Sequence, residues 1–311
     1  MAGDTRYRIL SLDGGGIRGV LSCTLIDRLE QANPGFLESI DLFAGTSTGG
    51  ILTLGLGAGK SPVDMRNLYE KNADKIFAQD VLEKILHISV DQLVEANYSN
   101  KALKAALQRE FGPITLGDLK KKVLVSSFDL DNLASGAGKI RSWKPKFFHN
   151  YPGPGTDAAE SVVDVALRTS AAPTYFPIYQ GFIDGGVVAN NPSMCALAQA
   201  MHELHDLPTP PQITLLSVGT GHSLDFLDEL NASWGLAQWA PHLVSIMMGG
   251  SEGVADFQCV QVLGSNYLRM DPVLPVGIGL DAYEQIPLLE QIGDGVDLTV
   301  ANAWIQGTFL G

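Results

Sequence analysis

The fold is decided by residues 7–29, which read YRILSLDGGGIRGVLSCTLIDRL. Residues 7–12 have the apolar pattern of a short strand, and apolar side chains recur at helical spacing over residues 17–29. Three glycines at 14–16 separate the two patterns. A strand, a glycine turn and a helix in that order are the opening unit of an α/β fold.

The same order returns at residues 41–57. A second strand is predicted at 41–44, the turn GTSTGG occupies 45–50, and the apolar run from Ile51 predicts a buried helix. Farther along, the patterns predict strands at 123–128, 181–183 and 213–218, helices at 61–77, 100–110, 161–171 and 191–205, and mostly helical structure from residue 234. We therefore expect one three-layer α/β/α domain over residues 1–311, with a mostly parallel central sheet.

The composition excludes several classes of protein. Of the 311 residues, 45% are hydrophobic and 18% are charged, which is too apolar for a disordered chain. No run reaches the roughly 18 apolar residues of a membrane span, and the first residues predict no secretion signal. Three scattered cysteines encode neither a disulfide framework nor a structural zinc site. We expect a cytoplasmic protein without a metal.

The charge is unevenly distributed along the chain. Lys and Arg number 21 against 34 Asp and Glu, and this net charge of −13 argues against a nucleic acid polymer as partner. Residues 101–146 nevertheless carry ten basic and four acidic side chains, whereas residues 147–311 carry two basic and seventeen acidic ones. The basic segment is interpreted either as a surface for an anionic partner or as an ordinary solvated face.

A possible nucleophile lies in Gly45-Thr46-Ser47-Thr48-Gly49, which matches the pattern G-x-S-x-G. Such glycines permit the sharp turn that projects a serine hydroxyl between a strand and a helix. The N-terminus of the following helix would favour an alkoxide or an oxyanion. The alternative is a glycine-rich turn with no chemistry.

The earlier glycine cluster, Asp13-Gly-Gly-Gly-Ile-Arg-Gly19, also satisfies the dinucleotide fingerprint G-x-G-x-x-G. That fold needs an acidic residue at the end of the next strand, but Asp41 begins its strand. Asp13 would also repel a pyrophosphate. The same loop can instead direct backbone N–H groups at a developing oxyanion, with Arg18 adding positive charge or bracing the loop. We favour the oxyanion hole; a dinucleotide loop and a plain tight turn are the alternatives.

A serine nucleophile needs a base. The sequence Asp184-Gly-Gly186 follows a short predicted strand, although Asp-Gly alone is more often a turn. Among the histidines only His222, in a loop after a strand, has the placement of a triad histidine. His202 and His205 lack the spacing of H-E-x-x-H and are interpreted as part of a solvated helix end.

Together these motifs resemble the patatin-like phospholipases and acyl hydrolases of bacterial type. The resemblance rests on three blocks in order, at residues 13–19, 45–50 and 184–186. Supporting blocks are residues 168–177, 188–193, 216–221 and 266–269. It covers residues 7–270, while the C-terminal part at 271–311 carries no motif and is expected to be helical.

The resemblance implies a serine acyl hydrolase that needs no cofactor and cleaves fatty acyl esters of phospholipids, lysophospholipids or neutral lipids. The implied site consists of the nucleophile Ser47, its base Asp184, the elbow glycines Gly45 and Gly49, and an oxyanion hole of Gly14, Gly15 and Gly16 assisted by Arg18. Some bacterial relatives are switched on by a host factor or a nucleotide second messenger, so a regulatory activator is also implied. Two other functions stay open: a dinucleotide-binding oxidoreductase and a catalytically silent lipid-binding or regulatory protein.

One further stretch, residues 234–248, concentrates apolar side chains and two tryptophans. It is interpreted either as a core helix packed on the sheet or as an acyl-chain groove or interfacial lid. Together with the basic segment, and with Lys120 to Lys122 in particular, it is expected to seat the protein peripherally on an anionic lipid surface.

Overall fold

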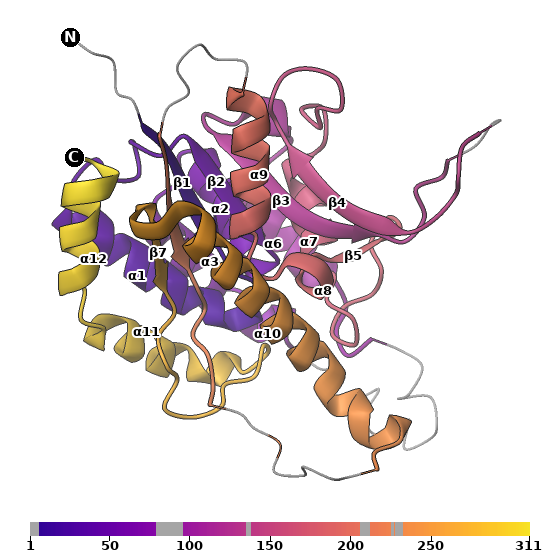
Figure 1. Cartoon of the computed structure of the whole chain (residues 1–311). Helices are drawn as coiled ribbons and strands as arrows, with labels where there is room; N and C mark the ends of the chain where they lie inside the picture. The colour runs from indigo at the N-terminus through magenta and orange to yellow at the C-terminus, as the bar shows by residue number, and fades with distance from the viewer. Residues whose placement is uncertain (1–5, 79–95, 135–137, 206–211, 225–226, 228–232) are drawn as a thin grey trace.

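A mixed β-sheet forms the centre of the computed structural model, which describes residues 6–78, 96–134, 138–205, 212–224, 227 and 233–311 (Figure 1). The strands described are β1 (Arg6–Leu12), β2 (Leu42–Thr46), β3 (Lys122–Asp129), β4 (Lys144–His149), β5 (Phe182–Asp184), β6 (Gln212–Val218) and β7 (Tyr267–Met270). Their order is β4-β3-β2-β1-β6-β7, and β5 also pairs with β3. The pairs β3–β2, β2–β1, β1–β6 and β6–β7 are parallel, whereas β3 is antiparallel to β4 and β5. The predicted mostly parallel sheet is confirmed.

Helices cover both faces of this sheet, which confirms the three-layer prediction (Figure 1). One face carries α1 (Gly19–Ala32), α2 (Thr48–Gly57), α3 (Pro62–Glu70), α6 (Lys101–Phe111), α7 (Val162–Thr169) and α11 (Ile286–Gly295), and the other carries α9 (Ser193–Leu204) and α10 (Leu236–Leu263). The shorter elements are η1 (Gly16–Arg18), α4 (Ala73–Ile76), η3 (Leu116–Asp118), α8 (Gly186–Ala189), η4 (Gly264–Asn266), η5 (Tyr283–Gln285), α12 (Thr299–Trp304) and η6 (Ile305–Phe309). Among the described helices none is both long and apolar enough to cross a bilayer.

Alternation along the strands divides the core between the two faces. Successive strand residues point to opposite sides of a sheet. In β1, Ile9 therefore packs with Leu215 in the smaller cluster against α9, while Leu10 packs with Leu216 in the larger cluster against α1 and α2. Because both faces are covered, the strands carry continuous apolar runs, as parallel sheets require.

The C-terminal segment, which carries no motif, packs against α1. Arg28 Nη1 donates to the carbonyl of Val296 at 2.9 Å, and Asn33 Nδ2 donates to Asn302 Oδ1 at 2.8 Å. Phe309 is fully buried in the larger core cluster. The helices after residue 285 thus share the core of the motif-bearing part.

The sequence patterns did not predict β4 and β7. Both lie at the ends of the strand order, and β4 reads KPKFFH. An edge strand has a hydrogen-bonded neighbour on one side only, so it tolerates charged residues and proline. A strand of that composition has no apolar run by which it could be recognised in the sequence. The helix predicted at 61–77 is also divided into α3 and α4.

Candidate active site

Ser47 occupies a strained turn between β2 and α2. Its backbone has φ 54° and ψ −121°, a left-handed conformation that is rare for a residue with a side chain. A Cβ at Gly49 would collide with the carbonyl oxygens of Leu12 and Asp13, so only glycine allows α2 to start this close to the end of β1. The turn therefore has the geometry of a nucleophile elbow.

Asp184 lies within hydrogen-bonding reach of Ser47. It is the last residue of β5, and the Ser47 hydroxyl donates to its carboxylate. The backbone N–H of Gly186 donates to Asp184 Oδ1 at 2.7 Å. Burial raises the pKa of Asp184 to about 6, while the hydrogen bonds from Ser47 and Gly186 act in the opposite direction. The carboxylate is therefore a stronger base than an exposed aspartate.

Thr169, the last residue of α7, fixes the backbone of the elbow. The N–H of Ser47 donates to Thr169 Oγ1 at 2.8 Å, and the Thr169 hydroxyl donates to the carbonyl of Ser126 at 2.6 Å. These two buried hydrogen bonds join α2, α7 and β3 at the nucleophile. The role of Thr169 was not predicted from the sequence, where its only signal is a place in the supporting block at 168–177.

The glycine loop after β1 lies on the other side of Ser47. Gly15 and Gly16 line the same cavity as Ser47, whereas the N–H of Gly14 donates to the carbonyl of Asn190 at 3.1 Å. The N–H of Gly14 is thus occupied, which differs from the prediction that three glycines form an oxyanion hole. Arg18 donates to the carbonyl of Gly15 at 3.4 Å and to that of Gly221 at 3.2 Å, so it braces the loop.

A mainly apolar cavity surrounds Ser47 and Asp184. Its apolar walls include Phe77, Leu103, Tyr175, Phe176, Val187, Val244 and Met248, contributed by residues after α4 and α7 and by α6, α8 and α10. Apolar walls around one nucleophile and one base suit a fatty acyl chain whose ester carbonyl lies at Ser47.

Among the described histidines, His222, His202 and His205 do not complete a triad with Ser47. His222 is not among the residues that line the cavity, and its Nδ1 lies 3.3 Å from Asp271 Oδ2. The rings of His202 and His205 stack on each other at the end of α9. In the described ranges no three His, Cys, Asp or Glu side chains gather where they could hold a metal ion.

Lys120 to Lys122 of the basic segment lie at the opposite end of the central strands from the cavity. Lys122 begins β3 and pairs with Leu42 at the start of β2, whereas Ser47 follows the end of β2. Lys120 to Lys122 are therefore at the opposite edge of the sheet from the cavity. A role for Lys120 to Lys122 in seating the protein on an anionic lipid surface stays a prediction from sequence.

Residues 236–248 of the apolar stretch form the N-terminal part of α10, and this part is not a core helix. Val244 and Met248 line the cavity, while Trp239, Leu243, Ile246 and Met247 are 41–49% exposed. The helix thus carries apolar side chains from the cavity wall to the protein surface.

Comparison with known proteins identifies the family. The sequence profile of the family described as patatin-like phospholipase matches residues 10–197. The chain belongs to the patatin-like phospholipase family. This patatin-like protein is accordingly an enzyme, a hydrolase of lipid esters, and its α/β/α fold is that of the family.

Relatives of this patatin-like enzyme occur in bacteria and plants. It is 33% identical to the cGAMP-activated phospholipase of Pseudomonas aeruginosa (strain BWHPSA011 / Pa011), with 87% of this chain and 80% of that protein covered. It is 27% identical to Patatin-like protein 2 of Arabidopsis thaliana, with 92% and 81% covered. Among solved structures, VipD from Legionella pneumophila aligns with a TM-score of 0.42 and 14% identity over 92% of this chain and 66% of that chain.

Proposed function

We propose that this enzyme hydrolyses fatty acyl esters of phospholipids or lysophospholipids through a Ser47–Asp184 dyad and an acyl-enzyme intermediate. One observation carries the proposal: a serine in a left-handed turn is hydrogen-bonded to a buried carboxylate inside an apolar cavity. Strain of this kind persists where the surrounding structure holds it, and it concentrates at functional sites.

The dyad can carry out both halves of the reaction. Asp184 accepts the Ser47 proton as Oγ attacks the ester carbonyl, and the tetrahedral intermediate collapses as the C–O bond to the alcohol breaks. Protonated Asp184 returns the proton to the leaving alcohol. Asp184 then takes a proton from water as the water attacks the acyl-enzyme, and gives it back to Ser47 Oγ when the fatty acid leaves.

A buried aspartate can act here without a histidine. At an ordinary pKa of about 3.9, aspartate is a weak base for a serine hydroxyl. Burial raises the pKa of Asp184 to about 6, which brings its basicity close to that of a histidine. The carboxylate is still ionised at neutral pH and can accept the proton.

We assign the oxyanion hole to Gly15 and Gly16. Both line the cavity with Ser47, and Gly16 has φ 58°, which turns the loop into its 3-10 turn. The N-terminus of α2 directly after Ser47 adds a favourable dipole for negative charge. Arg18 supports this loop through the carbonyl of Gly15.

The dinucleotide alternative is disfavoured by two observations. The N–H of Gly14 is bonded to Asn190, and the cavity beside the loop is lined mainly by apolar side chains. A pyrophosphate needs free N–H groups and positive charge instead. The silent lipid-binding alternative is decided by turnover itself, because a wild-type protein that binds lipid and releases no fatty acid would support it.

The direct test is hydrolysis of a lysophospholipid and of a soluble p-nitrophenyl ester by wild type, Ser47→Ala and the control Ser39→Ala, a half-buried serine whose hydroxyl donates to the carbonyl of Phe36. We expect Ser47→Ala to lose roughly 10⁴-fold or more of kcat with an unchanged unfolding temperature, and Ser39→Ala to match wild type. Wild-type activity in Ser47→Ala would overturn the proposal.

Contact with the lipid surface is assigned to the exposed residues of α10. Trp239, Leu243 and Ile246 continue the apolar wall of the cavity onto the surface, where they can enter the acyl boundary of a bilayer. The protein would then be peripheral to a membrane, and its cytoplasmic location stays a prediction from sequence. We further propose that residues 1–311 form one domain, because the C-terminal helices share its core.

A regulatory activator is proposed from the relatives alone. One of them is named a cGAMP-activated phospholipase, and it matches 87% of this chain. Adding cGAMP to the purified enzyme tests this directly. An increase in kcat would support regulation of this type, and an unchanged rate would argue against cGAMP as the activator.

A further inference from the structure

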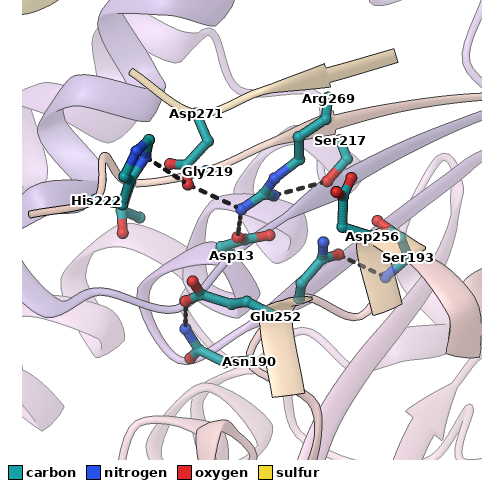
Figure 2. Close-up of polar contacts among 12 residues, drawn as sticks. Asp13, Asn190, Ser193, Ser217, Gly219, His222, Glu252, Asp256, Arg269 and Asp271 are labelled. Atoms are coloured by element: carbon teal, nitrogen blue, oxygen red, sulfur yellow. Dashed lines mark hydrogen bonds and ion pairs between the residues drawn. The ribbon is translucent and has the colours of Figure 1, made fainter. Parts of the chain in front are cut away.

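A charged network lies next to the glycine loop, between β7 and α10 (Figure 2). Arg269 of β7 is at its centre, with Nη2 2.5 Å from Asp13 Oδ2. The same guanidinium donates from Nη1 to Ser217 Oγ at 2.8 Å and from Nη2 to Asp271 Oδ2 at 3.2 Å. Asp13 directly precedes the three glycines, so Arg269 holds the first residue of the loop.

This ion pair is buried. Asp13 is 1% exposed, and the side chain of Arg269 is 16% exposed. Burial raises the pKa of Asp13, and the Arg269 guanidinium opposes that rise by favouring the carboxylate. A buried pair adds little net stability compared with apolar residues, but losing one partner leaves an uncompensated charge. Such a pair fixes geometry better than it stabilises the fold.

A second anchor holds the next residue of the loop. Asn190 Nδ2 donates to the carbonyl of Gly14 at 3.3 Å and is also hydrogen-bonded to Glu252 Oε1 (Figure 2). The Asn190 N–H donates to Ser251 Oγ at 3.1 Å. Ser251 and Glu252 belong to α10, the helix that supplies Val244 and Met248 to the cavity.

We propose that Arg269 is a positioning residue for the oxyanion hole, and that Glu252 supports the same loop through Asn190. Arg269 is not among the residues that line the cavity, and it acts through Asp13, two residues before Gly15. This inference rests on the proposed function, because it assigns a role to residues that hold the proposed oxyanion donors.

The geometry predicts which kinetic constant changes. A loosened loop weakens hydrogen bonds that form fully only to the oxyanion, so it lowers kcat. The apolar walls that bind the acyl chain are untouched, so KM stays the same. Displacing a group by about 1 Å can reduce the rate roughly 10²-fold, and removing one oxyanion donor has an effect of about 10²–10³.

The experiment compares wild type, Arg269→Met, Arg269→Lys, the double variant Asp13→Asn with Arg269→Met, and the control Arg66→Met. Arg66 is another partly buried arginine in ion pairs, with Glu70 and Glu290, away from the loop. Each protein is assayed for kcat and KM on a soluble p-nitrophenyl ester and for its unfolding temperature. Long incubation with a fluorophosphonate counts the reactive sites, so kcat refers to folded enzyme.

We expect Arg269→Met to lower kcat about 10- to 100-fold with KM within about twofold, and Arg269→Lys to restore part of the loss. The double variant should regain part of the unfolding temperature, because Asp13, the more deeply buried partner of Arg269, is no longer a carboxylate, while its kcat stays low. If Arg269→Met does not fold, the lysine and double variants carry the test.

A folded Arg269→Met with wild-type kcat, or a double variant in which kcat recovers with stability, would overturn the positioning role. Both results leave the proposed function intact as long as wild-type turnover depends on Ser47. A wild type whose turnover does not depend on Ser47 would overturn the proposed function and this inference together.

Discussion

Two buried aspartates on opposite sides of Ser47 show how surroundings set the role of a carboxylate. Asp13 follows β1 and is 1% exposed, and Asp184 ends β5 and is 4% exposed. Asp13 lies 2.5 Å from the Arg269 guanidinium, whereas Asp184 accepts hydrogen bonds from a serine hydroxyl and a backbone N–H. Burial is nearly equal, so the difference is the charge of the partner.

The charge of the partner decides whether each aspartate holds the loop in position or acts as a base. The Arg269 guanidinium at contact distance favours the carboxylate of Asp13 and fixes its position, although burial has the larger effect and raises the pKa of Asp13 to about 8. Asp184 has neutral donors instead, its pKa is raised to about 6, and one of those donors is the Ser47 hydroxyl, with which it can exchange a proton. On this account Asp13 orients the loop and Asp184 performs the proton transfers.

The largest expected effect comes from removing the base. Asp184→Asn keeps the shape and can still accept from Gly186, but it cannot take the Ser47 proton, so kcat should fall roughly 10⁴-fold. Steady-state hydrolysis of a soluble ester measures the loss. A kcat within tenfold of wild type would show that another group serves as the base.

The same variant should be more stable than wild type. Because the pKa of Asp184 is raised from 3.8 to about 6 in the folded state, folding becomes less favourable as the pH rises through that range. Removing the charge should therefore add on the order of 2–3 kcal/mol above pH 6, and the gain should shrink toward pH 4. Chemical denaturation at several pH values checks this, and a gain that grows at low pH contradicts the assignment.

The pH dependence of wild type gives the next largest effect. The base must be ionised, so kcat/KM should rise with pH and reach half of its plateau near the Asp184 pKa of about 6. Below that point the rate should fall about tenfold per pH unit. A profile that is flat from pH 5 to 8 would mean that proton transfer to Asp184 does not limit the reaction.

A smaller effect is expected at Thr169, which supports the nucleophile as Arg269 supports the loop. Thr169→Val removes the acceptor for the Ser47 N–H and should lower kcat about tenfold. Thr53→Val is the matched control, because Thr53 Oγ1 is buried with no hydrogen-bond partner among the described residues. Equal kcat values for the two variants would argue against a role for Thr169 in holding the elbow.

The smallest effect on hydrolysis of a soluble substrate is expected for substitutions on α10, which carries neither of the two aspartates. Leu243→Gln should leave hydrolysis of a soluble ester within about twofold and lower hydrolysis of phospholipid vesicles several-fold. Val262→Gln, at the other end of the same helix and also exposed, is the control. Equal vesicle activity of Leu243→Gln and wild type would remove α10 from the lipid contact.

The sequence predicted those parts of the site that lie in short, continuous patterns of residues. Ser47 and the glycine loop each lie in a contiguous strand-turn-helix pattern, whereas Asp184 was assigned as the base because the resemblance to the family implies it. The predicted oxyanion hole was too broad because it included Gly14. The N–H of Gly14 donates to the carbonyl of Asn190, which is 176 residues away in the chain.

The contacts that support the site could not be predicted in this way. Thr169 meets Ser47 across 122 residues, and Glu252 meets Asn190 across 62. No local spacing reports such pairs, because they follow from how β3, α7 and α10 pack around the sheet. The separation of Lys120 to Lys122 from the cavity likewise follows from strand direction and is not visible in charge composition.

The most direct measurement is the rate and position of fluorophosphonate labelling in wild type and Asp184→Asn, by intact mass and peptide mapping. Our account predicts a single adduct on Ser47 in wild type and a strongly slowed adduct at the same serine in Asp184→Asn. Labelling of another residue in wild type, or labelling of Ser47 in Asp184→Asn at the wild-type rate, would contradict the assignment of Asp184 as the base that activates Ser47.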